Sequence, residues 1–152
     1  MLKTIVCAAA LLSALSAWPS QAADRGTAEE AVAMVKKAVE QLKTTPPQQV
    51  YTDINNKDPR FANGDLYVFI QDAKGNVLAH GANIKLVGKD ASENQDADGK
   101  FYVKERMETA KTKGEFWLDY KFANPTLKKI EMKSTYCESV SETIVCVGIY
   151  KQ

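Results

Sequence analysis

The stretch Lys133-Ser134-Thr135-Tyr136 places a lysine and three hydroxyl side chains in a row of strand-forming residues. Side chains alternate between the two faces of a strand, so Lys133 and Thr135 share one face and Tyr136 lies on the other. Many strand lysines point to water, and a solvated Lys133 is one interpretation. If that face is covered instead, a buried ammonium needs an anionic partner, and the hydroxyl beside it would complete a carboxylate site. Lys133 is therefore the first candidate for binding a ligand.

His80 is the only histidine of the chain, which limits the chemistry that the chain can perform. A Ser-His-Asp or Cys-His mechanism would have to use it, and no nucleophile-elbow motif surrounds any serine. One histidine without a neighbouring ligand pair is poor material for zinc, and the CxxCH motif of covalent haem is missing. We expect no enzyme activity, no cofactor and no metal site. His80 is then either a hydrogen-bonded residue at a strand end or a ligand contact at a pocket mouth.

The acidic stretch from Asp90 to Asp98 is a weaker candidate, for a cation. Its spacing departs from that of an EF-hand loop, because the glycine and the distal glutamate do not fall at the required positions. A solvated acidic loop is the favoured interpretation.

Cys137 and Cys146 flank a predicted hairpin centred on Ser141 and Glu142. Both lie equally far from that centre, so they are directly opposed and close enough to bridge. An even pair of cysteines in an exported chain predicts a disulfide. By loop entropy this bridge would contribute roughly 2.5–3 kcal/mol. A redox-active dithiol is the alternative, but the CxxC spacing of oxidoreductases is absent.

The N-terminus has the pattern of a secretory signal peptide. Lys3 precedes an apolar run from Thr4 to Leu15 that is too short to span a bilayer, and Ser20-Gln21-Ala22 fits a cleavage site after Ala22. A retained N-terminal anchor is the alternative. Cleavage removes residues 1–22 and leaves residues 23–152, which is enough for one domain. We expect a periplasmic or secreted domain.

The charge balance excludes two classes of partner. The chain has 20 Lys and Arg against 19 Asp and Glu, and loss of the signal peptide removes one lysine, so the mature domain carries no net charge. Without a basic run it has no electrostatic footprint for nucleic acid or anionic lipid. No second apolar stretch of membrane-spanning length follows, so we expect no direct membrane insertion after cleavage.

The order of elements predicts an α+β domain. Apolar residues recur at helical spacing over Thr27–Leu42, and a second short helix or turn follows at Gln48–Ile54. A polar loop from Gly81 to Lys100 has the length of a binding loop. The helix Phe101–Lys111 after it presents Phe101, either Val103 or Lys104, Met107 and Ala110 on one side. Five strands are expected at Leu66–Gln71, Asn76–His80, Glu115–Phe122, Lys128–Val140 and Thr143–Tyr150.

These elements predict a PAS-like five-stranded antiparallel sheet. The long N-terminal helix covers one face, and the polar loop with its short helix, which connects the second and third strands, covers the other. The hairpin register assigns the last two strands to these faces. One face is mostly apolar, with Met132, Ser134, Tyr136, Val145, Val147 and Ile149. The other carries Lys133, Thr135, Cys137, Cys146, Gly148 and Tyr150. Gly148 would leave space there for a close approach.

Three segments together resemble the single Cache sensor domains, specifically the type-2 single Cache group. They are GDLYVFIQDAKGNVLAHGANIKLVGKD, DGKFYVKERMETAKTKGEFWLDYKFANP and KKIEMKSTYCESV, followed by the terminal VGIY. The resemblance implies a PAS-like extracytoplasmic domain of chemoreceptors and sensor kinases that binds small organic ligands, short carboxylates among them. It implies a pocket involving Trp117, Tyr120, Lys133, Tyr136 and the strand ending at His80. Lys133 and Tyr136 lie on opposite faces, so only one can reach the pocket unless a bulge intervenes.

We complete the expected ligand-binding set with Phe101 and Thr135. Unlike the usual family member, this sequence shows no membrane-spanning segment or output module after Tyr150. We therefore expect a free-standing exported module that binds a short carboxylate and presents it to a membrane receptor or sensor kinase. The alternative is a structural or protein-interaction domain whose pocket is filled by its own side chains, such as Trp117 and Phe101.

Overall fold

The computed structural model describes residues 25–151. The predicted signal peptide and its cleavage site lie outside these residues. Within them, no helix is both long and apolar enough to cross a membrane.

Two helices precede the sheet. The first, α1 (Ala28–Thr44), begins at a capping box: the Thr27 side chain accepts from the Glu30 backbone, and the Glu30 side chain accepts from the Thr27 backbone. It buries one stripe, made of Ala31, Val35, Ala38 and Val39. The second, α2 (Pro47–Asn55), has its proline at the first helical position, where no backbone donor is lost. The sequence placed both helices correctly.

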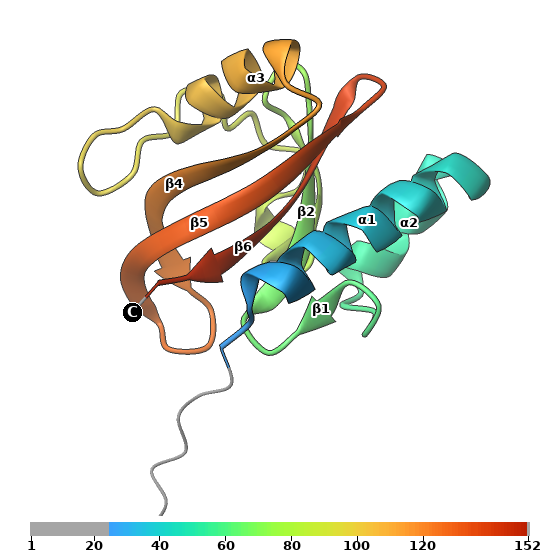
Figure 1. Cartoon of the computed structure of the whole chain (residues 1–152), viewed down its shortest axis with the longest axis horizontal. Coiled ribbons are helices and arrows are strands. Elements are labelled where there is room, and N and C mark those ends of the chain that lie inside the picture. The colour runs from blue at the N-terminus through green and yellow to red at the C-terminus, as the bar shows by residue number, and fades with distance from the viewer. Residues whose placement is uncertain (1–24, 152) are drawn as a thin grey trace, which may run out of the picture.

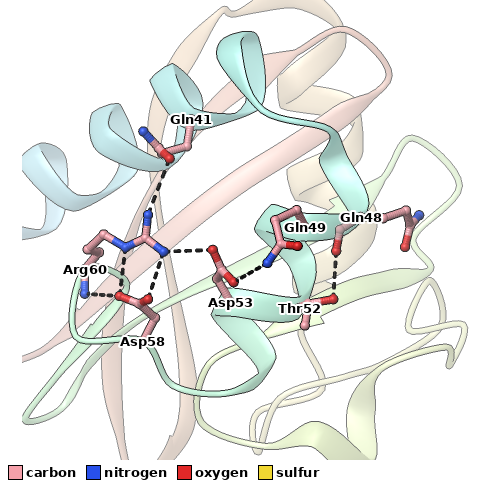
Figure 2. A network of polar contacts seen from close by, with 7 residues as sticks. All are labelled: Gln41, Gln48, Gln49, Thr52, Asp53, Asp58 and Arg60. Atoms are coloured by element: carbon pink, nitrogen blue, oxygen red, sulfur yellow. Dashed lines mark hydrogen bonds and ion pairs between the residues drawn. The ribbon is translucent and has the colours of Figure 1, made fainter.

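A single arginine ties these helices to the segment that follows them (Figure 2). The Arg60 guanidinium lies 2.7 Å from the Asp53 carboxylate on α2 and 2.8 Å from that of Asp58, and it donates to Gln41 on α1 at 3.4 Å. The hydrogen bond from Arg60 lowers the pKa of Asp58 to about 2. Exposed pairs of this kind add little stability, so the network's effect is to fix where the chain leaves α2.

The strands form one antiparallel sheet in the order β1-β2-β6-β5-β4, and β3 also pairs with β2. Their bounds are β1 Ala62–Asn63, β2 Leu66–Asp72, β3 Val77–His80, β4 Glu115–Asn124, β5 Lys129–Val140 and β6 Thr143–Tyr150. The five predicted strands are therefore present, and β1 is a two-residue addition at the edge of β2. The PAS-like fold class is confirmed.

The hairpin of β5 and β6 has the predicted register. Val140 pairs with Thr143 across the turn, and Cys137 pairs with Cys146. The two cysteines form a disulfide with a Cα–Cα distance of 4.2 Å. The disulfide prediction is confirmed.

Different elements cover the two faces of the sheet (Figure 1). The helices α1 and α2 pack on one face around a closed apolar core that contains Val35, Ile54, Val68 and Val147. The other face is covered by α3 (Tyr102–Thr112) and by the connector from β3, which includes the 3-10 helix η1 (Ile84–Leu86).

The inner side of α3 matches the predicted one in part. Phe101 caps the helix from outside and is 38% exposed, whereas the buried side chains are Tyr102, Val103 and Arg106. Val103 is thus buried, and Met107 and Ala110 pack against the same core, as predicted, while Tyr102 and Arg106 are additions that the apolar spacing does not indicate.

Candidate functional site

A cavity of about 300 Å³ lies between the sheet and α3. Strands β2, β4 and β5 form its floor, α3 forms one wall, and the connector from Leu86 to Asn94 forms its mouth. Its lining residues are Tyr67, Phe69, Gln71, Val77, His80, Leu86, Lys89, Asp90, Ala91, Asn94, Tyr102, Arg106, Tyr120, Phe122 and Lys133. The sheet face opposite α1 is thus hollow.

Lys133 projects from β5 into this cavity and is 1% exposed. Its path requires Gly148 on the neighbouring strand, because a Cβ there would lie 2.1 Å from the Lys133 Cε atom. The Nζ atom donates to the Tyr67 hydroxyl at 2.6 Å. It also lies between 4.1 and 5.5 Å from four aromatic ring centroids, those of Tyr67, Phe69, Phe122 and Tyr150. Of the two interpretations offered by the sequence, the buried lysine is the observed one.

No carboxylate neutralises Lys133 at close range. Among residues 25–151, no acidic oxygen lies within 4 Å of its Nζ atom. Burial, and secondly the charge of Arg106, lower the pKa of Lys133 well below its ordinary value, while the more distant Asp65 opposes this change. An anion placed in the cavity would therefore be strongly favoured by this amine and would help it to hold its proton.

Arg106 is the second buried cation of the cavity, and the sequence analysis missed it. It is 1% exposed, and its Nη1 atom donates to the Gln71 side chain on β2. Its Cζ atom lies 4.9 Å from the Phe69 ring centroid and 5.3 Å from that of Tyr120. The available signal was its spacing, four residues after Tyr102 and three after Val103 on one helix face.

Two nitrogens of Arg106 have no partner. The Nε and Nη2 atoms are both buried, and neither makes a hydrogen bond to residues 25–151. Buried donors are normally satisfied, and a buried charge without hydrogen bonds is especially costly. These two atoms lie on one edge of the guanidinium, the geometry that binds a carboxylate through two parallel hydrogen bonds.

His80 closes the cavity at the end of β3 as a neutral donor. Its Nδ1 atom accepts from the backbone of Ala82 at 3.3 Å and of Asn83 at 3.0 Å, so the proton resides on Nε2. Burial, followed by the charges of Lys133 and Arg106, lowers its pKa to about 3. His80 therefore remains uncharged at neutral pH and adds no second function as an acid or base there.

Tyrosine and threonine hydroxyl groups contact one another at the floor of the cavity. Tyr120 lines it directly, with its ring stacked on Tyr102 at 4.4 Å. Thr135 lies one layer deeper and donates to the Tyr120 hydroxyl at 3.1 Å. Below Lys133, the hydroxyls of Tyr67 and Tyr150 lie 3.1 Å apart. Thr135 thus positions Tyr120 and does not line the cavity.

Three other candidates lie outside the cavity. Tyr136 faces the α1 side, where its hydroxyl donates to Glu115 at 2.6 Å. Trp117 packs against Tyr136 on that side and is 41% exposed. Phe101 lies at the surface beneath the Lys104 amine, 4.7 Å from its ring centroid. The pairing of β5 with both neighbours runs without a bulge, so alternation keeps Lys133 and Tyr136 apart.

Carboxylates in the acidic stretch of the connector accept hydrogen bonds from backbone nitrogens. Asp96 accepts from the backbone nitrogens of Asp98, Lys100 and Lys121, and thereby fastens the connector to the edge of β4. Asp90 accepts from the Ser92 nitrogen. Within the described part of the chain, no cluster of three or more acidic, histidine or cysteine side chains has the arrangement of a metal site.

Comparison with known proteins agrees with this architecture. The family model described as single Cache domain 2 matches residues 21–151. Among solved structures, a methyl-accepting chemotaxis protein from Vibrio parahaemolyticus is 20% identical, with a TM-score of 0.70 over 80% of this chain and 86% of its own. A Cache chemosensory domain studied for carboxylic acid recognition is 24% identical, with a TM-score of 0.68 over 82% and 92%. The periplasmic sensor domain of a chemotaxis protein is 20% identical, with a TM-score of 0.65 over 82% and 90%. A search among curated proteins gave no match.

Proposed function

This chain belongs to the single Cache domain 2 family, and we propose that it is an exported sensor module that binds a short organic carboxylate in the cavity between its sheet and α3. Cache sensor domains are extracellular, non-enzymatic ligand-binding domains. The structural neighbours, which include a Cache domain that recognises carboxylic acid, make this ligand class a reasonable expectation for a chain with the same fold.

The observation that carries the proposal is the unpartnered edge of Arg106. Arg106 lines the cavity, and two buried donors of its guanidinium make no hydrogen bond to residues 25–151, although Asp90 lies at the mouth of the same cavity. Lys133, on the floor of the cavity, likewise lacks an acidic partner among residues 25–151. A carboxylate would satisfy the guanidinium by two charge-assisted hydrogen bonds, and the aromatic walls would cover a short hydrocarbon chain.

The self-filled alternative is less well supported. It required side chains such as Trp117 and Phe101 to close the concave side of the sheet, and neither lines the cavity. The space that remains, about 300 Å³, is at the lower end of the range of small-molecule sites.

Calorimetry and thermal unfolding with short carboxylic acids test the proposal. We expect binding of acids but not of the amides or alcohols of the same length, with stabilisation of about 2.7 kcal/mol at one hundred times Kd. Arg106→Gln should abolish binding, whereas Lys129→Met, on the same strand as Lys133 but exposed, should leave it intact. If no acid stabilises the protein and Arg106→Gln changes nothing, the proposal is wrong.

The proposal includes a signalling partner in the membrane, a receptor or sensor kinase. The chemotaxis proteins among the structural neighbours motivate it. Contacts within the domain connect the cavity to the two N-terminal helices, and they support this part of the proposal. The His80 backbone donates to Asn55 at the end of α2, and Arg60 joins α2 to α1. Cross-linking in the native cell envelope, with and without the acid, should capture a membrane receptor in a ligand-dependent way. If the same receptor is cross-linked to the same extent with and without the acid, this part of the proposal is wrong.

A further inference from the structure

We propose that the cavity is built for a ligand with a carboxylate at each end, a short dicarboxylate of three or four carbons that spans Arg106 and Lys133. This inference rests on the proposed function and narrows its ligand class. It follows from the positions at which the two buried cations contact β2, and from the aromatic ring of Phe69 between those positions.

The two cations occupy opposite ends of one row of side chains. Every second residue of β2 faces the cavity, and these residues are Tyr67, Phe69 and Gln71. Because a strand advances about 3.4 Å per residue, the first and the last of them are well separated along the strand. Lys133 is bonded to Tyr67 at one end, and Arg106 to Gln71 at the other. The cavity therefore has two positive poles, with Phe69 in the middle.

The Phe69 ring also limits how far apart the poles lie. The Arg106 Cζ atom is 4.9 Å and the Lys133 Nζ atom 5.5 Å from its centroid, so the two cannot be separated by more than the sum of these distances. After a hydrogen bond of about 2.8 Å at each pole, roughly 5 Å or less remains between the two acceptor oxygens. Oxygens at the two ends of a three- or four-carbon diacid can span that distance.

Electrostatics favours two negative charges over one. A monocarboxylate at Arg106 would leave the buried Lys133 amine without an anionic partner, whereas a dicarboxylate pairs both groups. The donors near Lys133 fit this assignment: the amine has hydrogens beyond the one given to Tyr67, and the neutral His80 carries its proton on Nε2.

The decisive comparison is between butanedioate and butanoate, which have the same number of carbons. By calorimetry at neutral pH we expect the wild-type protein to bind butanedioate at least about 30-fold more tightly, since a charge-assisted hydrogen bond is worth roughly 10- to 100-fold. Lys133→Met should reduce this ratio to below about threefold, and Lys129→Met should preserve it. Equal binding of the two acids by the wild type would overturn the inference and leave the proposed function standing, whereas binding of neither, nor of any other short acid, would overturn both.

A second measurement does not depend on a variant. Burial depresses the pKa of Lys133, and a carboxylate at its pole would raise it again. Butanedioate binding should therefore take up protons, detected as a difference in binding enthalpy between two buffers of different ionisation enthalpy. Uptake with butanedioate that matches uptake with butanoate would place the second carboxylate away from Lys133 and contradict the inference.

Discussion

On the sheet face beneath α1 and α2, the side chains Val68, Val145 and Val147 are completely buried in a closed apolar core. On the opposite face, Tyr67 of β2 and Lys133 of β5 line a cavity, and Tyr150 of β6 packs in the second core cluster beside it. Adjacent residues of one strand therefore serve different purposes, packing on one side and recognition on the other. Because each side chain commits to one face, changes on the two faces should affect stability and binding separately.

The largest expected effect is on the closed face. Phe61→Ala removes a fully buried ring from the α1 core, and large-to-small changes of this kind cost about 3–5 kcal/mol. Urea unfolding should show this as a lower midpoint with an unchanged slope. Carboxylate affinity should change less than twofold at a temperature where the variant is folded. A loss of affinity with little loss of stability would contradict the separation of the faces.

Low pH should destabilise the folded protein through His80, which lies on the cavity face. Its folded pKa of about 3 lies below the ordinary value of 6.5, so the unfolded chain binds the proton first and stability falls as the pH drops from 6.5 towards 3. At about pH 4 the loss from this residue should be roughly 3 kcal/mol. The pKa values of Asp72 and Asp119 are also lowered, so the wild-type protein loses stability through them as well.

Comparison with His80→Gln isolates the histidine, because the variant keeps the carboxylates and an acceptor side chain. Urea unfolding at neutral pH and at about pH 4 should show a smaller acid loss in the variant, by about the amount given above. Parallel losses in the two proteins would mean that His80 is hydrated and charges readily.

The disulfide should contribute next. Cys137 and Cys146 lie on the cavity face and close a short hairpin, and the loop-entropy model gives about 2.5 kcal/mol for such a loop. We expect the double Cys→Ser variant to remain folded with a lower unfolding midpoint. Treatment of the wild-type protein with a reductant should reproduce that midpoint. Equal midpoints with and without the bridge would show that the hairpin is already ordered in the unfolded chain.

Lys133→Met should have a smaller effect of the opposite sign. It replaces a buried amine by an apolar side chain of similar length, and such replacements are often neutral or stabilising, here by about 1–2 kcal/mol. Thermal unfolding without ligand should give an equal or higher midpoint, while the preference for butanedioate over butanoate is lost. A marked destabilisation would instead assign Lys133 a structural role in holding Tyr67 and its neighbours.

Residues on the strands were predictable because strand alternation has a fixed period of two. The register of β5 and β6 follows from the two cysteines, and it assigns Lys133, Thr135 and Gly148 to one face from the sequence alone. Whether that face was covered could not be read from the strand itself. It depends on how the connector and α3 pack against it, which is a tertiary property.

Arg106 shows where sequence reasoning failed. Helical patterns are interpreted by assigning charged residues to solvent, and this rule hides a cation that a helix turns inward for binding. Tyr102 and Arg106 at a spacing of four, both facing the Phe69 strand, form the wall that the rule overlooked. Conversely, Trp117 and Tyr136 were grouped with the pocket by resemblance, although both lie on the closed side.

Trp117 therefore provides the smallest and most specific test of the two faces. It is 41% exposed and contacts Tyr136 on the side away from the cavity. Trp117→Ala should change carboxylate affinity less than twofold, which is about 0.4 kcal/mol, because no cavity wall is altered. Tyr120→Ala, three residues along the same strand and lining the cavity, is the matched comparison and should weaken binding at least tenfold. Calorimetry on both variants decides the point, since a large loss in the tryptophan variant would mean that the ligand contacts the outer face of β4 and that the cavity beneath α3 is not the binding site.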